Sequence, residues 1–429
     1  MRSGFGRANK SIGLYWKENT DIMNRPALWR LPFILISAAS FFLFLAFYTL
    51  STTLPLYVER ALGGTQGQMG LSMMAFILAA VVCRPLAGRW VDKLGSRPIL
   101  LTGIGLFFAA SLLYFAISGY RALLALRVVH GIGFGLAATA ASAAAAQLVP
   151  AERKGEGIGY FSLFISLAMV VGPFVGLTVT ADSAAGFDAL FGLCAAFAAA
   201  ALLAGLPAKL PQPAAFAAAE ATPTSPPPAA PSFLRSMFER RALPIALAGF
   251  ILAFAYSGIT TFISVYADEL ELAQSASWFF VTFALMIVLP RPITGRLFDR
   301  FGAHVLVYPG IALFAIGVAA LGLADSSFAF LASGAVIGLG YGLLFPSFQT
   351  LAIQSSPPHR AGIATSTYFV LFDSGYGIGS YALGMLAAGS SYASMYLVSA
   401  VIAAFSALSY YTLHHRKEHS AAAIAALPH

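Results

Sequence analysis

Three ionisable side chains lie inside long apolar stretches of this sequence. Asp373 lies in a run of apolar, small and glycine residues at 371–379, and Arg127 and His130 lie one turn apart in the apolar run 122–147. A charge at the centre of a bilayer costs about 2.5–3.5 kcal/mol on insertion scales, so such charges face the interior of a helix bundle and carry function. A carboxylate there can exchange protons, a guanidinium can hold an anion, and an imidazole titrates near neutral pH. The three residues are candidates for proton coupling or substrate binding.

The chain repeats one pattern at a constant offset of 207 residues. Residues 84–95 read RPLAGRWVDKLG, and residues 291–302 read RPITGRLFDRFG. The same offset relates three further glycines in each copy, which are Gly131, Gly133, Gly135 and Gly338, Gly340, Gly342. Duplicated hydrophobic halves are typical of secondary transporters, which bind their substrates between the repeats.

The candidate charges depart from this repeat. Arg127 corresponds to Gly334, and Asp373 corresponds to Ser166, so the scaffold requires neither charge. Structural alternatives remain open: a hydrogen-bonding role for Asp373, an extended side chain reaching the headgroups for Arg127, and packing or hydrogen bonding for His130.

Composition identifies the class of protein. The chain of 429 residues is 59% hydrophobic and only 10% charged, with a mean hydropathy of +0.80, whereas soluble domains carry about 25% charged residues. Twelve apolar runs are long enough to span a bilayer, at about 20 residues each. They lie near 31–58, 68–88, 98–118, 122–147, 157–180, 186–206, 242–267, 274–296, 303–323, 328–354, 361–388 and 391–413. We therefore predict an all-α integral membrane protein with twelve transmembrane helices in two pseudo-symmetric six-helix bundles.

The distribution of Lys and Arg predicts the orientation of the chain. Basic residues concentrate before the first run and in alternate loops, which places both termini in the cytoplasm by the positive-inside rule. The net charge of +8 is then a consequence of topology, and we expect no nucleic-acid partner. The predicted segments are a cytoplasmic leader (1–30), a first bundle (31–206), a cytoplasmic Pro/Ala-rich linker (207–241), a second bundle (242–413) and a cytoplasmic tail (414–429). The histidines of the tail are expected to be solvated rather than to bind metal; they are His414, His415, His419 and His429.

The repeated segments carry the most specific motif. They resemble the loop signature of the major facilitator superfamily, with Gly88, Arg89, Asp92, Gly95 and Arg97 in the first copy and Gly295, Arg296, Asp299, Arg300 and Gly302 in the second. Ala303 and His304 stand where the second copy would end in basic residues. The first glycine of each copy permits close helix approach and the second permits a tight turn.

The resemblance implies a fold and a gating role. In the family, two six-helix bundles rock around a central cavity, and Asp92 would engage the start of the eleventh span near Gly362, with Asp299 engaging the fifth span near Gly157. These contacts would join the halves on the cytoplasmic side of the outward-open state. Arg127 resembles the family's arginine of span four. Gly172, Pro173 and Gly176 resemble, in part, the signature of drug:proton antiporters, although Ala168 and Leu177 replace preferred glycines.

Further residues are candidates for lining the cavity. Arg84 and Arg291 lie one turn deeper than the motif glycines and could ring the cytoplasmic mouth or anchor headgroups. Polar and aromatic candidates lie on stripes at helical spacing, although most such residues contact lipid or other helices; they are Tyr48, Ser257, Tyr341 and Gln349.

The sequence favours a proton-driven exporter of a small organic molecule in a bacterial-type inner membrane, functioning as a monomer. Its expected partners are the lipid bilayer, the substrate and protons, with no cofactor, since no Gly-rich nucleotide-binding loop is present. A proton-coupled importer of a sugar or organic acid is the alternative within this class, and a non-transporting membrane sensor is the alternative outside it. An enzyme is not expected, because no nucleophile–base pair or metal cluster stands out.

Overall fold

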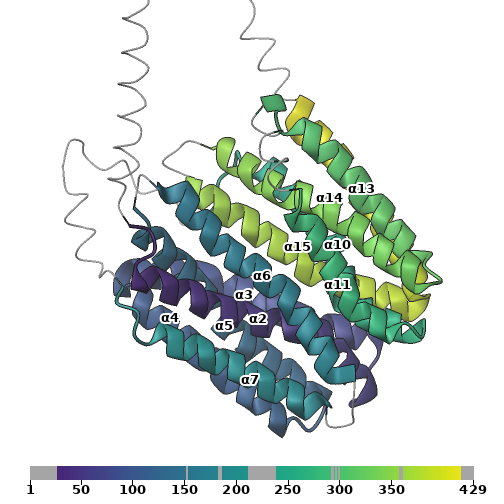
Figure 1. Ribbon diagram of the computed structural model, residues 1–429, viewed down its shortest axis with the longest axis horizontal. Coiled ribbons are helices and arrows are strands. Elements are labelled where there is room, and N and C mark those ends of the chain that lie inside the picture. Colours follow the sequence, from purple (N-terminus) through teal and green to yellow (C-terminus); the bar gives the residue numbers. More distant parts are fainter. Residues whose placement is uncertain are drawn as a thin grey trace, which may run out of the picture.

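The computed structural model describes residues 27–150, 153–181, 186–210, 238–290, 294, 297, 300–356 and 361–416. Of Asp92 only the backbone is described. Twelve α-helices of 16 to 30 residues account for almost all of these ranges, and they form two bundles that lie side by side (Figure 1). The first bundle contains α2 (Leu31–Arg60), α3 (Gln66–Leu94), α4 (Ser96–Leu113), α5 (Tyr120–Leu148), α6 (Lys154–Ala181) and α7 (Gly186–Gly205). The second contains α10 (Leu243–Glu269), α11 (Ala273–Val288), α13 (His304–Gly322), α14 (Ser327–Gln354), α15 (Ala361–Gly389) and α16 (Tyr392–Tyr410), which continues into the π-helical turn η4 (Tyr411–His415).

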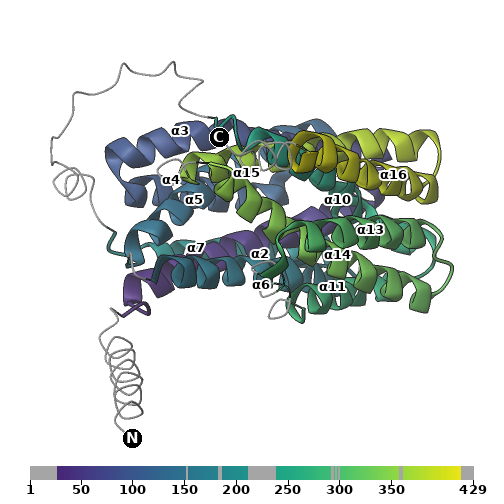
Figure 2. The same cartoon turned by 90° about the horizontal axis from the view of Figure 1, so that it is seen from above.

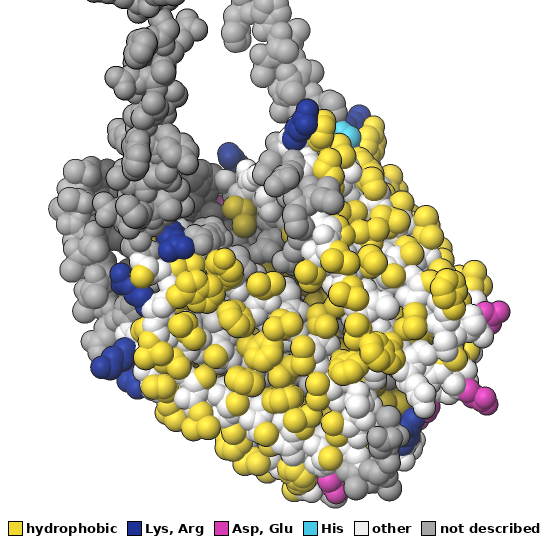
Figure 3. All heavy atoms as spheres, viewed as in Figure 1, with side chains coloured by type: hydrophobic (Ala, Val, Ile, Leu, Met, Phe, Trp, Pro, Cys, Tyr) yellow, Lys and Arg dark blue, Asp and Glu magenta, His cyan; other side chains and the backbone are white. Residues whose placement is uncertain are grey.

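The helices have the length and surface of membrane spans. Ten of those in the described ranges are long and apolar enough to cross a bilayer, and α11, with 16 residues, and α15 complete the predicted twelve. Apolar side chains cover the middle of the molecule, while Lys and Arg gather at one end and Asp and Glu at the other (Figure 3). We call these the basic end and the acidic end. The all-α membrane fold predicted from the sequence is confirmed.

Local signals explain where several helices begin. Thr65 caps α3: its hydroxyl accepts the Gln68 N–H at 3.4 Å, and its own N–H donates to Gln68 Oε1 at 2.9 Å. The hydroxyls of Ser326 and Ser391 cap α14 and α16 by accepting the N–H groups of Ala329 and Ser394. Such caps satisfy backbone donors that the first turn of a helix leaves unpaired.

The helix contacts inside each half repeat at the same offset as the sequence motifs. The paired glycines lie where two helices cross so closely that a Cβ atom would collide with a neighbouring backbone. Their partners obey the same offset of 207: Gly131 packs on Phe76 and Gly338 on Phe283, Gly133 on Phe107 and Gly340 on Phe314, and Gly135 on Ala80 and Gly342 on Ile287. The duplication inferred from motif spacing is therefore a duplication of helix contacts.

The two halves meet mainly through α3 against α15, with further contacts of α6 with α11 and α2 with α10. Viewed from above, α3, α4, α5 and α7 lie on one side and α13, α14 and α16 on the other, with α15 next to helices of the N-terminal half (Figure 2). Three polar contacts between the halves lie toward the acidic end. Arg60 pairs with Asp268 at 2.6 Å, Ser264 donates to the Thr52 carbonyl at 2.8 Å, and Ser380 donates to the Gly70 carbonyl at 3.2 Å. The described conformation is thus closed at the acidic end.

The motif glycines behave differently from one another. Gly95 and Gly302 have φ values of 89° and 80°, as a tight turn after each motif helix requires. A Cβ at Gly88, in contrast, would meet nothing within 4 Å. The close helix approach predicted at Gly88 is absent from this conformation.

Candidate functional site

An ion pair joins the two halves at the boundary between α3 and α15. Arg84 Nη2 and Asp373 Oδ2 are 2.7 Å apart, and the side chains are only 23% and 18% exposed. The two residues were separate candidates in the sequence, Arg84 for the cytoplasmic mouth and Asp373 for proton coupling. The fold brings them together because α3 and α15 pack along one another.

Small residues set the register of these helices. The Ser380 hydroxyl bonds the Gly70 carbonyl, and a Cβ at Gly70 would collide with the backbone of Ser380. Gly377 lies against Ile77. Close backbone approach through small residues is the common device for packing helices in lipid, and here it places Arg84 and Asp373 opposite each other further toward the basic end.

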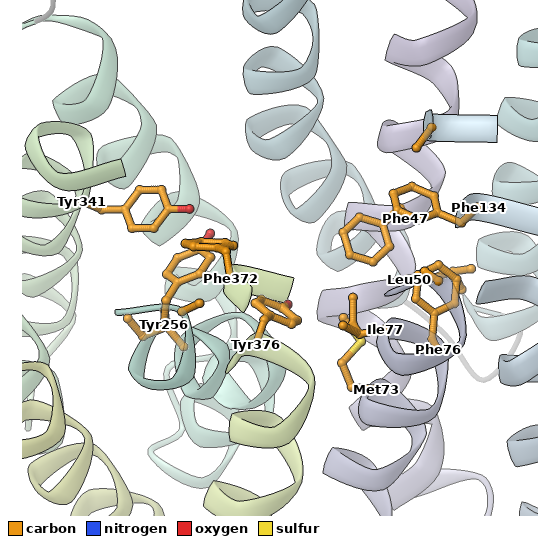
Figure 4. Packing of buried hydrophobic residues seen from close by; sticks show 14 of the residues in the cluster. Phe47, Leu50, Met73, Phe76, Ile77, Phe134, Tyr256, Tyr341, Phe372 and Tyr376 are labelled. Atoms are coloured by element: carbon orange, nitrogen blue, oxygen red, sulfur yellow. The ribbon is translucent and has the colours of Figure 1, made fainter. Parts of the chain in front are cut away.

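Tyrosines surround the ion pair. Tyr48 of α2, Tyr341 of α14 and Tyr368 of α15 lie within electrostatic range of the Asp373 carboxylate. Tyr256 stacks on Tyr341 with ring centroids 4.4 Å apart. Figure 4 shows Tyr256 and Tyr341 of the C-terminal half facing Phe47, Phe76 and Ile77 of the N-terminal half. Aromatic rings thus line both sides of the boundary at this level.

Several buried polar atoms near the pair have no hydrogen-bond partner among the described residues. They are Arg84 Nε and the hydroxyl oxygens of Tyr256 and Tyr368. A buried donor without a partner costs about 1–3 kcal/mol, and a site for a polar ligand is one reason to retain such groups. All three atoms can donate a hydrogen bond.

Arg127 occupies a second buried site, inside the N-terminal half. Its side chain is 1% exposed. Nε donates to the Ser72 carbonyl at 3.2 Å, Nη1 donates to the Tyr114 hydroxyl at 3.3 Å, and the guanidinium lies 4.2 Å from the centroid of the Phe76 ring. No described carboxylate lies within ion-pair distance. These contacts place the guanidinium inside the bundle, which argues against the alternative of an extended side chain at the surface.

His130 is held on both ring nitrogens. Nδ1 shares a hydrogen bond with Tyr114 at 3.2 Å, and Nε2 shares one with Ser111 at 3.3 Å. The ring packs 3.9 Å from that of Phe107. This geometry matches the packing and hydrogen-bonding alternative: His130 fixes Tyr114, and Tyr114 in turn orients Arg127.

A chain of polar contacts leads from Arg127 to the other half. Arg127 Nη2 lies 3.2 Å from Met73 Sδ, which also accepts from Ser51 at 3.8 Å. Ser51 shares a hydrogen bond of 3.1 Å with the Tyr376 hydroxyl, which bonds Thr260 at 2.6 Å. Tyr376 lies one turn from Asp373 on α15. Through these two hydrogen bonds it bridges α2 and α10.

The antiporter-like segment packs α6 onto α2. A Cβ at Gly172 would lie 2.9 Å from Tyr48 Cβ, and one at Gly176 would lie 2.9 Å from Thr49 Cγ2. Thr49 donates to the Gly172 carbonyl at 3.1 Å. Pro173 follows within the same helix. These contacts hold Tyr48 beside the ion pair.

No described contact joins the remaining predicted residues to the pair. Ser257 is buried between α10 and α15, where it donates to the Phe254 carbonyl, and Gln349 is half-buried on α14. Arg89, Arg97 and Arg300 are exposed at the basic end, and Arg97 donates to the Leu206 carbonyl at 3.0 Å. Four predicted residues lie outside the described ranges; they are Arg291, Gly295, Arg296 and Asp299.

Sequence reasoning missed Tyr376, Tyr256 and Tyr368. Tyr376 could have been found, because a polar ring three residues after an intramembrane carboxylate shares its helix face. Tyr256 and Tyr368 carried no such signal, since aromatic residues are frequent throughout the spans.

Relatives and solved structures agree with this architecture. The chain is 25% identical over 349 residues to an uncharacterised MFS-type transporter of Methanocaldococcus jannaschii, covering 80% of this chain and 88% of that protein. It is 29% identical over 136 residues to the quinolone resistance protein NorA of Staphylococcus aureus, which covers 32% of this chain and only 35% of NorA.

Solved structures show the likeness in fold. A crystal structure of the nucleoside transporter NupG superposes with a TM-score of 0.70 at 13% identity, covering 89% of this chain and 98% of NupG. A POT family transporter in complex with a thioalcohol-conjugated peptide gives 0.69 at 14% identity, covering 88% and 94%. The sequence profile of the Major Facilitator Superfamily matches residues 36–380 and, in a second alignment, 273–428. The chain therefore belongs to the Major Facilitator Superfamily and is a secondary transporter of that type.

Proposed function

We propose that this transporter exports a small organic molecule with an aromatic or apolar body in exchange for protons. The observation that carries the proposal is the ion pair between Arg84 and Asp373, which lies between the halves and among tyrosines. The local similarity to NorA and the glycine–proline segment at 172–176 support export. The charge distribution along the chain supports a bacterial-type inner membrane with both termini in the cytoplasm, and we expect a monomer.

Exchange of substrate for protons follows because both depend on the Asp373 carboxylate. In the described conformation Asp373 is paired with Arg84. A proton on Asp373 removes one member of that pair and leaves Arg84 without its counter-charge. A substrate that depends on the ionised pair is then excluded while the proton is bound. Proton and substrate therefore occupy the site in turn, and alternating access carries them in opposite directions.

A second candidate is favoured by the unpartnered donors. Arg84 Nε and the hydroxyls of Tyr256 and Tyr368 could receive an anion once Asp373 is protonated. An organic acid would then bind together with the proton, and the protein would be a symporter. The two candidates predict opposite effects of protons on substrate affinity.

Proton linkage of binding separates the candidates. A thermal-shift screen of organic cations, neutral aromatic compounds and organic acids identifies a ligand, and its Kd is measured between pH 5.5 and 8.5. For antiport, affinity weakens as pH falls, by up to about tenfold per pH unit for one competing proton. For symport, affinity strengthens instead. Asp373→Asn should remove the dependence in either case, while Asp268→Asn, which breaks the exposed pair at the acidic end, should retain it. A Kd that does not change with pH in the unaltered protein would remove Asp373 from both schemes.

A further inference from the structure

One hydroxyl group joins the two halves near the middle of the molecule. The Tyr376 hydroxyl on α15 shares a hydrogen bond of 3.1 Å with Ser51 of α2, in the opposite half, and one of 2.6 Å with Thr260 of α10, in its own half. All three side chains are buried, with exposed fractions of at most 7%. Because buried hydroxyl groups are costly to leave unpaired, these two bonds hold α15 against both helices.

The sequence repeat does not require this contact. The offset of 207 relates Tyr376 to Met169 and Ser51 to Gly258, so neither hydroxyl has a counterpart in the other half. Asp373, one turn before Tyr376, departs from the repeat in the same way. Two positions on one face of α15 therefore differ from the repeat, and both carry a contact to the opposite half.

That face of α15 meets α2 at two successive turns. Asp373 and Tyr376 are three residues apart on α15, and Tyr48 and Ser51 are three residues apart on α2, so each pair shares one helix face. Ser51 bonds Tyr376, and Tyr48 lies within electrostatic range of both Asp373 and Tyr376. The bond of Tyr376 to α2 is thus one turn closer to the acidic end than the ion pair of Asp373 with Arg84.

The two bonds restrain α15 in a way that its packing on α3 does not. Close backbone approach sets how far α15 slides along α3, through Ser380 on Gly70. Glycine and serine present little side chain that could resist rotation of α15 about its own axis. The Tyr376 phenol supplies that restraint, because it is anchored on two other helices. Asp373 shares the face of Tyr376, so the same restraint keeps its carboxylate toward Arg84.

We propose that Tyr376 is a positioning residue that couples closure of the acidic end to the ion pair of Arg84 and Asp373. The bond to Ser51 exists only while the halves are together at this level. When the acidic end opens, that bond breaks and the bond to Thr260 remains, since α10 and α15 belong to one half. Helix α15 then loses the restraint that turns Asp373 toward Arg84. The inference rests on the central site of the proposed function, but neither the direction of transport nor the coupling ion enters it.

Distances between spin labels on the full chain test the proposal. Ser118 and Asp325 are equivalent under the repeat, exposed, and located in acidic-end loops of the first and second halves. Labels on cysteines introduced there report a short distance for the closed acidic end and a long one for the open end, while the native Cys83 and Cys194 are buried. Tyr376→Phe should raise the ratio of long to short distances about two- to tenfold, as expected for one net hydrogen bond.

Two further variants show whether the bond between the halves causes this shift. Ser51→Ala removes the partner in the opposite half and should raise the ratio by a similar factor, and adding it to Tyr376→Phe should change little further. Tyr396→Phe is the matched control, because the Tyr396 hydroxyl is also buried but donates to the Gly258 carbonyl, at 3.3 Å, within the C-terminal half. This control should leave the ratio unchanged.

Coupling to the ion pair is measured in a double-variant cycle. Asp373→Asn removes a contact between the halves and should itself raise the ratio. That effect should be at least about twofold smaller in Tyr376→Phe than in the otherwise unaltered protein, whereas a merely structural tyrosine would leave it the same. Effects of Asp373→Asn and Tyr376→Phe that multiply independently, an unchanged ratio in both Tyr376→Phe and Ser51→Ala, or an equal shift in Tyr396→Phe would overturn the proposal. Because the readout is a distance and needs no substrate, the result is independent of the pH dependence of Kd that tests the proposed function.

Discussion

Removing the two members of the central ion pair, separately and together, tests whether Arg84 and Asp373 are coupled. Asp373→Asn leaves the Arg84 guanidinium without its counter-charge, and Arg84→Gln leaves the carboxylate alone. The double variant removes both charges and leaves neutral side chains of similar size. Comparing the four proteins gives the interaction energy of the pair, because effects on each residue's other contacts cancel.

The structure sets the expected size of that energy. With 2.7 Å between the charged atoms, the charge centres lie roughly 4 Å apart, which corresponds to a gross attraction of about 4 kcal/mol at an effective dielectric constant of 20. Both side chains are about four-fifths buried, so desolvation offsets part of this attraction. We expect a coupling energy of about 1–3 kcal/mol, within the range measured for contacting residues.

Two assays on the same preparations separate packing from transport. Thermal unfolding in one detergent at one scan rate reports packing, and about 1 kcal/mol shifts the midpoint by about 2–4 °C for a unit of 150–250 residues, the size of each half. Each single variant should lower the midpoint, and the double variant should lower it by less than the sum. Flux driven by a pH gradient in proteoliposomes should be lost in Asp373→Asn and should not return in the double variant.

Either of two results would refute this reasoning. Midpoint shifts that add within error would mean that the ion pair contributes no interaction energy. Undiminished gradient-driven flux in Asp373→Asn would show that the carboxylate does not couple transport to protons, whatever its effect on packing.

Three other predictions concern residues outside this pair. Arg127→Ala should abolish flux and Arg127→Lys should keep only part of it, because ammonium lacks the planar fork of donors; normal flux in the alanine variant would contradict a role at the site. Asp92→Asn should shift spin labels at the acidic ends of the two halves toward their shorter distance, by a several-fold change in population for a helix-end contact of about 0.3–2 kcal/mol, and unchanged distances with intact transport would make it an ordinary turn residue. Gly131→Ala should lower the thermal midpoint, since its Cβ would collide with the Phe76 backbone, whereas Gly88→Ala, with open space around it, should not; equal midpoints would show that close packing at Gly131 is dispensable.

Much of the fold could be predicted because its signals are local. Apolar runs of sufficient length predict spanning helices, and the constant spacing of Gly131 and Gly338 predicts that both halves repeat the same helix crossings. The structure confirms both, down to the equivalent partners Phe76 and Phe283. The turns at Gly95 and Gly302 could likewise be predicted, because a turn with positive φ favours glycine.

The central site could be predicted only as separate residues. Asp373 stood out as a lone carboxylate in an apolar helix, but nothing in the sequence pairs it with Arg84, since that contact depends on how α3 packs against α15. Gly88 shows a second limit, because a motif glycine in the sequence does not tell in which conformation its close helix contact forms. The tail was expected to be solvated from residue 414, but the ring of His415 stacks on that of His304 with centroids 3.8 Å apart. The polar composition of the tail gave no sign that α16 continues into η4.

The contacts that close the acidic end also bear on how fast it can open. Two of them run from a serine hydroxyl to a backbone carbonyl that already belongs to a helix, and Ser380 has an acceptor in its own helix as well, the Gly377 carbonyl at 2.8 Å. When the halves part, that hydroxyl keeps a partner, so separation strands no buried donor at this point. The exposed pair of Arg60 and Asp268 is worth about 0–1 kcal/mol. These contacts hold the two halves in register, yet each can break and form again at little cost in free energy. This suits a protein that must open and close in every turnover.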